Sequence, residues 1–154
     1  MVSFFMDSDV NIKRCTGQLP IGFAELEIEA IAEGHNHLTR LAAEMVQSPR
    51  IFHAMFACYV GETLAGIGAI TDEPSASKSS SMWRMRRLYV RRQFRRRHIG
   101  RMIVAALLNE ARQRASIVTV HAGNSEAPKF WEGIGFHRVA NQTSWSHEMS
   151  VSGP

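Results

Sequence analysis

The sequence predicts a single α/β (α+β) domain, residues 1–154, built on a mixed sheet of about seven strands flanked by about four helices. Three observations lead to this prediction. The length of 154 residues fits one domain that can bury a core. Apolar residues make up 45% and charged residues 21% of the chain, as in folded globular proteins. Stretches with strand and helix periodicity follow one another in the order β-αα-βββ-α-β-α-ββ.

The first half of the chain is expected to form a strand, two helices and a hairpin. Val10 and Ile12 alternate with polar residues, as in a half-buried strand. Leu26 and Ala30 recur at helical spacing, while Gly34 and the Ser-Pro dipeptide at 48–49 end the two helical stretches. The expected elements are a strand over 9–16, helices over 19–33 and 38–47, and strands over 51–60 and 64–71 that meet in a tight turn.

The second half is expected to contain the strongest helix of the chain, with strands on either side of it. Ile99, Ile103 and Leu107 recur at every fourth position, on one face of a helix. Residues 117–120 read I-V-T-V, and β-branched side chains favour a strand. The expected elements are a strand over 83–90, a helix over 99–114, a strand over 117–122, a helix over 125–133 and a final hairpin from residue 136 onward.

Half of the positive charge lies in one window, residues 84–101. The window holds nine of the eighteen Lys and Arg residues and neither Asp nor Glu, so its charge is +9. The rest of the chain has nine basic and fourteen acidic residues, which gives −5 and the overall +4. Such a split predicts a face that binds an anion. Because the window leads from a strand into a helix start, whose free N–H groups attract phosphate, a diphosphate is the expected ligand.

No metal, membrane span or secretory signal is expected. Cys15 and Cys58 lack metal-ligand spacing and are interpreted as reduced core thiols, which suits a cytoplasmic protein. His35 and His37 lie two positions apart, but no third ligand accompanies them. The apolar runs are all shorter than the ~18 residues of a membrane-spanning helix.

Two motifs in the second half resemble those of the GNAT acetyltransferase superfamily. Residues 95–100 read R-R-R-H-I-G and follow L-Y-V at 88–90, which resembles the family's Q/R-x-x-G-x-G/A turn between a strand and a helix. Residues 124–136 read N-S-E-A-P-K-F-W-E-G-I-G-F, which is similar to the family's N-x-x-A-x-x-F-Y-x-x-x-G-F. The order and separation of the two motifs fit the family, and together they cover residues 82–136.

The resemblance implies a fold and a reaction. The fold would be a twisted, mostly antiparallel sheet with a V-shaped splay between strands 83–90 and 117–122. The reaction would be transfer of an acetyl group from acetyl-CoA to a primary amine of a small molecule or peptide, by direct attack of the neutral amine. Acetyl-CoA would be the co-substrate, and the protein would be a monomer or homodimer. Neither a membrane nor a nucleic acid is an expected partner.

The resemblance also implies a cofactor site. Backbone N–H groups of the turn would hold the pyrophosphate, and an N–H near Leu88 or Tyr89 would bind the thioester oxygen and stabilise the oxyanion. The second motif would flank the pantetheine and the sulfur. The implied cofactor-binding residues are Leu88, Tyr89, Val90, Arg95, Arg96, Arg97, His98, Ile99, Gly100, Arg101, Asn124, Ala127, Phe130 and Trp131.

The sequence departs from the family pattern in three ways, two at the turn and the strand before it and one at Trp131. His98 replaces the first glycine of the turn, and its ring either turns outward or adds a phosphate contact. Arg84 and Arg86 occupy positions where the family often places a general base, and a guanidinium cannot serve as one. We expect them either to bind a carboxylate or phosphate of the acceptor, or to be solvated or paired with glutamates.

The general acid and base are less clear from the pattern. Trp131 occupies the position where the family usually has a Tyr that acts as general acid. An indole N–H is no useful proton donor, so the thiolate of coenzyme A would leave as the anion or be protonated by water or another group. His121 follows the strand that splays from the cofactor strand, and it is either the base or a structural histidine. His35 and His37 lie in a loop that borders the acceptor site in this superfamily.

Glu25, Glu29 and Glu33 form a stripe on the first helix, which is either a solvated face or an attraction for a cationic amine. An amino acid or a peptide N-terminus would suit both the glutamates and the arginines. Two other functions remain open. The departures at His98, Arg84 and Trp131 are compatible with a module that binds acyl-CoA but has lost catalysis, and the arginines of 84–101 with nucleic-acid binding.

Overall fold

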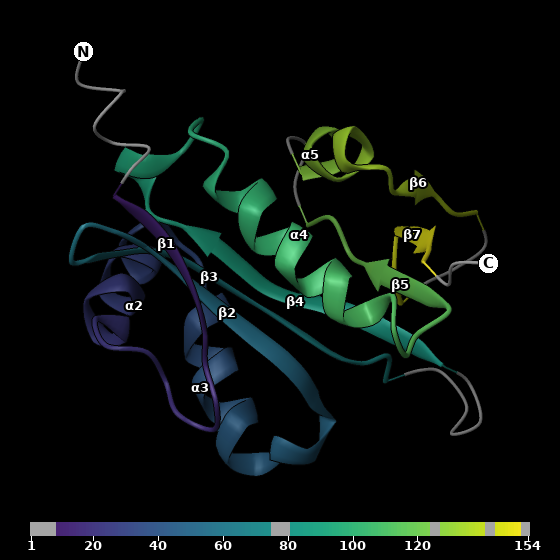
Figure 1. Ribbon diagram of the computed structural model, residues 1–154, viewed down its shortest axis with the longest axis horizontal. Coiled ribbons are helices and arrows are strands. Elements are labelled where there is room, and N and C mark those ends of the chain that lie inside the picture. Colours follow the sequence, from purple (N-terminus) through teal and green to yellow (C-terminus); the bar gives the residue numbers. More distant parts are fainter. Residues whose placement is uncertain (1–8, 75–80, 124–126, 141–143, 152–154) are drawn as a thin grey trace.

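The computed structural model describes residues 9–74, 81–123, 127–140 and 144–151. Within these ranges the elements follow the predicted order (Figure 1). They are β1 (Val10–Arg14), α2 (Phe23–Ala32), α3 (His37–Gln47), the 3-10 turn η1 (Pro49–Ile51), β2 (Phe52–Val60), β3 (Thr63–Asp72), β4 (Met82–Val90), the 3-10 turn η2 (Arg92–Phe94), α4 (Ile99–Ala111), β5 (Ile117–Val120), α5 (Ala127–Ile134), β6 (His137–Arg138) and β7 (His147–Ser150).

The strands form one sheet of seven, in the order β1-β2-β3-β4-β5-β7-β6. Every neighbouring pair is antiparallel except β4 and β5, which run parallel. This parallel pairing covers only three positions and ends at Arg84 opposite Thr119. Beyond that point β4 continues to Val90 while β5 stops at Val120, so the strands part without further pairing. The predicted mixed sheet with a V-shaped splay is confirmed.

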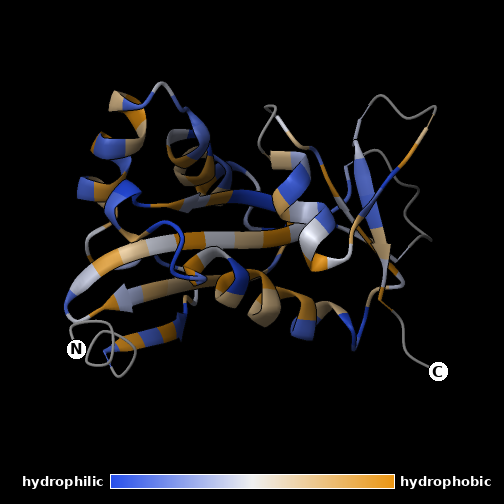
Figure 2. Ribbon diagram, turned by 90° about the horizontal axis from the view of Figure 1, so that it is seen from above, coloured by the Kyte–Doolittle hydropathy of each residue, from blue (hydrophilic) through white to orange (hydrophobic). Residues whose placement is uncertain are grey.

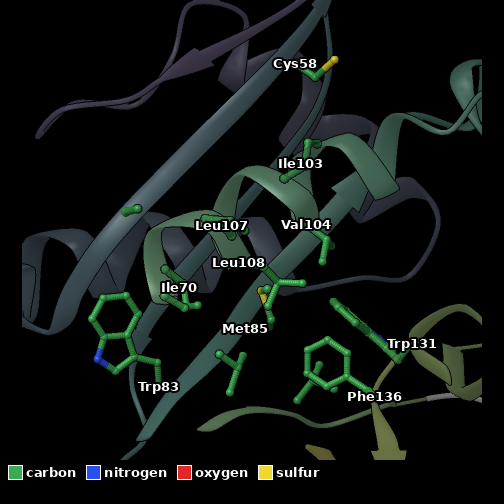
Figure 3. Close-up of a cluster of buried hydrophobic side chains, with 14 of the residues drawn as sticks. Cys58, Ile70, Trp83, Met85, Ile103, Val104, Leu107, Leu108, Trp131 and Phe136 are labelled. Atoms are coloured by element: carbon green, nitrogen blue, oxygen red, sulfur yellow. The ribbon is translucent and has the colours of Figure 1, made fainter. Parts of the chain in front are cut away.

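Helices cover both faces of the sheet. Figure 2 shows α2 and α3 on one side and α4 on the other. The α4 face holds a large buried cluster in which Leu107 and Leu108 pack with Met85 of β4 and with Trp131 and Phe136 of the α5 region (Figure 3). A second cluster lies under α2 and α3 and includes Leu26, Leu38, Leu41, Ile67 and Tyr89. In the described residues, no helix is long and apolar enough to span a bilayer.

A β-bulge in β4 changes which side chains face which helices. The pairing with β3 jumps from Ala69–Arg86 to Ile67–Tyr89, so Arg87 and Leu88 both lie opposite Gly68. Before the bulge Trp83 and Met85 face the α4 cluster, whereas after it Leu88 and Val90 pack there. Arg87 takes the bulge position with φ 57°, a left-handed conformation that is unusual for a residue with a Cβ. Arg86 and Arg87 therefore both face α3.

Candidate active site

The start of α4 presents backbone N–H groups that can donate to an anion. Arg96 and His98 both have left-handed backbone, at φ 65° and 64°, and His98 caps the helix without a side-chain hydrogen bond to it. The first helical hydrogen bond runs from the Met102 N–H to the His98 carbonyl, at 3.0 Å. In the part of the chain that the structure describes, the backbone N–H groups of 96–101 donate to no protein atom. Such a turn at the positive end of a helix dipole is an anion-binding nest.

The second motif packs against this turn through Gly100. A Cβ at Gly100 would lie 3.2 Å from Cζ of Phe130 and 3.6 Å from a methyl group of Val90, so glycine is what allows α5 to approach. The structure therefore brings together Gly100, Phe130 and Val90, which the sequence analysis placed at one site. Ala127 begins α5, and Asn124 lies outside the described residues.

The arginine window divides into paired and unpaired members. Five arginines form ion pairs with four glutamates, and among the described residues the other four window arginines have no carboxylate partner. The pairs are Arg84–Glu73 at 2.7 Å, Arg86–Glu44 at 3.3 Å, Arg87–Glu44 at 2.7 Å, Arg91–Glu29 at 3.3 Å and Arg95–Glu33 at 2.6 Å. The four without such a partner, Arg92, Arg96, Arg97 and Arg101, all flank the start of α4.

Glu33 links the end of α2 to the turn before α4. Arg95 donates to both of its carboxylate oxygens, at 2.6 and 3.1 Å, and also to the Val90 carbonyl. The Tyr89 hydroxyl donates to Glu33 as well. The hydrogen bond from Arg95 lowers the pKa of Glu33, while burial and then the Glu33 carboxylate raise the pKa of Tyr89. Two members of the acidic stripe, Glu29 and Glu33, are thus neutralised by Arg91 and Arg95.

Arg84 is held at the vertex of the splay. Its Nε donates to Glu73 at 2.7 Å, and its Nη2 donates to the Ser144 carbonyl at 2.5 Å. The Glu73 side chain is 0% exposed and accepts a further hydrogen bond from the Thr119 hydroxyl at 2.8 Å. This network joins β3, β4 and β5 where the parallel pairing ends. The position matches the ion-paired interpretation of Arg84.

Two histidines, His35 between α2 and α3 and His37 at the start of α3, lie next to each other. The rings of His35 and His37 stack at 5.4 Å, and His35 lies edge-on to Tyr89 at 6.1 Å. Partial burial lowers the pKa of His37, and so do the charges of His35, Arg87 and Arg40. His121 is exposed and follows the last residue of β5. No group of three or more potential metal ligands occurs within the described ranges.

Trp131 lies in the core rather than on the surface. Its ring packs edge-on against Phe130 at 5.0 Å. It also packs edge-on against Phe136 at 5.3 Å (Figure 3). The Oε2 atom of the neighbouring Glu132 accepts a hydrogen bond from Nε2 of buried His147, at 2.7 Å. His147 belongs to β7, so this contact fastens α5 to the sheet and supports Phe130 at the α4 turn.

Sequence reasoning missed Arg87 and Glu44 as members of this site, and it did not pair Glu33 with Arg95. That pairing could have been found, since the Glu29 and Glu33 spacing equals that of Arg91 and Arg95. Arg87 could not, because strict alternation places it on the opposite face from Arg86, and only the bulge turns it toward α3.

The chain was compared with known proteins and structures. It matches the family model described as an acetyltransferase (GNAT) domain over residues 21–147. A proposed acetyltransferase from Exiguobacterium sp. 255-15 is similar in structure, with TM-score 0.80, 19% identity and coverage of 92% of this chain and 93% of that one. The GNAT family N-acetyltransferase YhbS from Escherichia coli, solved with CoA, has a TM-score of 0.70 and 13% identity, and the match covers 94% of this chain and 82% of that one. A proposed acetyltransferase from Salmonella typhimurium, yncA, was solved with acetyl-CoA. Its TM-score is 0.64 and its identity 14%, and the match covers 94% of this chain and 95% of that one.

No protein of curated function matches the sequence. The family match covers most of the chain, and the structural matches share its fold. The protein therefore belongs to the GNAT acetyltransferase family. The resemblance stated from the two motifs is confirmed, and so is the enzyme class, an acyltransferase, at the level of the family.

Proposed function

We propose that the protein transfers an acetyl group from acetyl-CoA to a primary amine. The observation that carries this proposal is the backbone nest at 96–101 beside the splay of β4 and β5. Among the described residues its N–H groups have no protein acceptor, and the arginines around it have no carboxylate partner. Two structural neighbours were solved with CoA or acetyl-CoA, which supports the same ligand here. A diphosphate needs both the N–H groups and the positive charge that this turn offers.

The turn before α4 would bind the pyrophosphate of the cofactor. The N–H groups of 96–101 would hold the pyrophosphate, with the side chains of Arg96, Arg97 and Arg101 adding charge-assisted contacts. Arg95 would act differently, because its guanidinium is bound to Glu33 and Val90 and so shapes the turn from behind. The open edge of β4 beyond Arg84 would pair with the pantetheine arm, and a backbone N–H at Leu88 or Tyr89 would stabilise the oxyanion.

The amine must lose a proton to react, and two histidines are candidates for the base. His121 lies just beyond β5, at the open side of the splay, and its exposure allows it to work through water. His37 begins α3, and partial burial lowers its pKa, which favours the neutral ring that can accept a proton. The buried position of Trp131 favours departure of the CoA thiolate without help from that residue.

A thiol-release assay with acetyl-CoA and a panel of amines tests the proposal. We expect CoA release that depends on an amine, with the acetylated amine detected by mass spectrometry. Binding of acetyl-CoA without transfer to any amine would instead identify a module that has kept the cofactor site and lost catalysis. Because five of the nine window arginines are engaged with glutamates, we do not propose nucleic-acid binding.

A cytoplasmic location is also proposed, from the free thiols of Cys15 and Cys58. A monomeric or homodimeric state stays a prediction, as does the choice between a small molecule and a peptide as acceptor.

A further inference from the structure

We propose that the amine acceptor carries an oxyanion, a carboxylate or a phosphate, and that Arg86 and Arg87 bind it. The inference rests on the proposed acetyl transfer and names the class of acceptor. It moves the anion site away from Arg84, whose guanidinium is committed to Glu73 and the Ser144 carbonyl.

The first support is an excess of positive charge at one point on the acceptor face. Arg91 pairs with Glu29 of α2, Arg95 with Glu33, which caps the C-terminus of α2, and Arg84 with Glu73. Glu44 of α3, in contrast, serves two arginines. Arg87 donates to both of its oxygens, at 3.2 and 2.7 Å, and Arg86 shares Oε2 at 3.3 Å. One carboxylate cannot neutralise two guanidinium groups, so one positive charge is left over.

The second support is that both arginines keep donors to spare. Arg86 uses Nε for the Thr71 hydroxyl and Nη1 for Glu44, which leaves Nη2 without a protein partner among the described residues. Arg87 uses Nε and Nη2, which leaves Nη1 in the same state. Within the described ranges no buried side-chain nitrogen or oxygen lacks a partner, so these two nitrogens are reached by solvent. They offer N–H groups to an incoming oxyanion.

The third support is burial of the guanidinium groups. The side chains of Arg86, Arg87 and Glu44 are only 14%, 15% and 24% exposed. Holding an uncompensated charge in such a place is unfavourable, because water solvates it poorly. In agreement, burial is the main cause that lowers the pKa of Arg86. Glu44 opposes this shift, whereas the neighbouring Arg87 and Arg84 add to it. A bound anion would compensate the buried positive charge. A pair of one arginine and one glutamate with only a structural role would leave no such charge to compensate.

The position of the pair fits an acceptor site. Arg87 is the bulge residue of β4, and Leu88, whose N–H is a candidate oxyanion donor, follows it directly. Both arginines face α3, on the opposite side of the sheet from α4. His37 lies close enough for Arg87 to lower its pKa. An anion held by Arg86 and Arg87 would therefore bring a nearby amine to β4 from the α2–α3 side, between the vertex of the splay and the phosphate turn.

The experiment compares matched acceptors and matched variants in the thiol-release assay with the full chain. The acceptors are alanine against alaninamide, for the carboxylate, and O-phosphoethanolamine against ethanolamine, for the phosphate. Arg87→Gly removes the guanidinium at a backbone position that glycine adopts without strain, so it should fold. Arg86→Gln is the second variant, and Arg50→Gln is the control, since Arg50 is exposed on η1.

We expect the wild type to prefer at least one anionic acceptor over its neutral partner by tenfold or more in kcat/KM. Arg87→Gly and Arg86→Gln should each reduce this preference about tenfold through KM, as expected when a charged contact is lost. Activity on the neutral acceptors should fall less than activity on the anionic ones, so that the ratio between the two is the readout, and Arg50→Gln should behave as the wild type.

Three results would overturn the inference. Equal or better use of the neutral acceptors, or a preference that survives in both variants, would leave the acetyltransferase in place and remove the anion site. No acetyl transfer to any of the four acceptors or to a wider amine panel would remove the proposed function and the inference with it.

Discussion

Replacing Arg84 tests whether this residue supports the fold or binds the acceptor. In the structure its guanidinium is the cationic partner of Glu73, whose side chain is 0% exposed. Arg84→Met would leave that carboxylate buried with the Thr119 hydroxyl but without its guanidinium. Breaking a buried ion pair from one side costs about 3 to 5 kcal/mol of unfolding free energy. For a domain of this size, 3 kcal/mol corresponds to a fall in melting temperature of roughly 6 to 12 °C.

The assay is thermal or urea unfolding of the wild type, Arg84→Met, Glu73→Gln and the double variant. Since both charges are then absent, we expect the double variant to recover much of the stability that Arg84→Met loses. Acceptor KM, measured at a temperature where the variants are folded, should stay near the wild-type value. A loss below about 1 kcal/mol together with a large rise in acceptor KM would refute this reasoning, and would return Arg84 to the acceptor site.

Three further predictions address the turn, the α2 contact and the base. Gly100→Val would push a branched side chain into the Phe130 ring, which a Cβ alone already approaches to 3.2 Å, and calorimetry should show acetyl-CoA binding weakened about tenfold or more. Because Arg95 lowers the pKa of Glu33, their ion pair stabilises the fold above pH ~4.3, and this stability is lost as the pH falls through the pKa of Glu33 in the folded protein. In urea unfolding, the stability of Glu33→Gln should therefore depend less on acid pH than that of the wild type. An unchanged pH dependence would disprove the role of the pair. If His37 is the base, the rate of the wild type should rise with pH in the range below pH ~6.5, and His37→Ala should abolish this rise. His121→Ala should keep it. The reverse outcome would assign the base to His121.

Local patterns were enough to predict the elements and the turn that precedes α4. The helix that became α4 has apolar residues at every fourth position, and residues 95–100 carry a motif whose function depends on backbone geometry within one turn. Boundaries were less certain. The first helix starts at Phe23 rather than near residue 19, because Gly22 adopts a left-handed conformation at φ 92° and forms its cap. Strand β5 ends at Val120, two residues before the predicted end.

Contacts between distant segments could not be predicted in the same way. Arg95 and Glu33 are 62 residues apart, and their pairing depends on how α2 crosses the end of β4. The sharing of Glu44 by Arg86 and Arg87 requires the bulge, which reverses the alternation that sequence reasoning assumes. For the same reason, the sequence predicted that the glutamate stripe would either face solvent or attract an amine. In the structure, Glu29 and Glu33 form ion pairs with arginines of the same chain.

The most direct test of the proposed cofactor site is a calorimetric titration of the protein with acetyl-CoA. We expect binding of one molecule per chain in the wild type and in the exposed-site control Arg50→Ala. The double variant Arg96→Ala/Arg97→Ala should bind at least tenfold more weakly, because it removes two charges beside the backbone nest. No binding by the wild type, or equal affinity in all three proteins, would contradict the placement of the diphosphate at the start of α4.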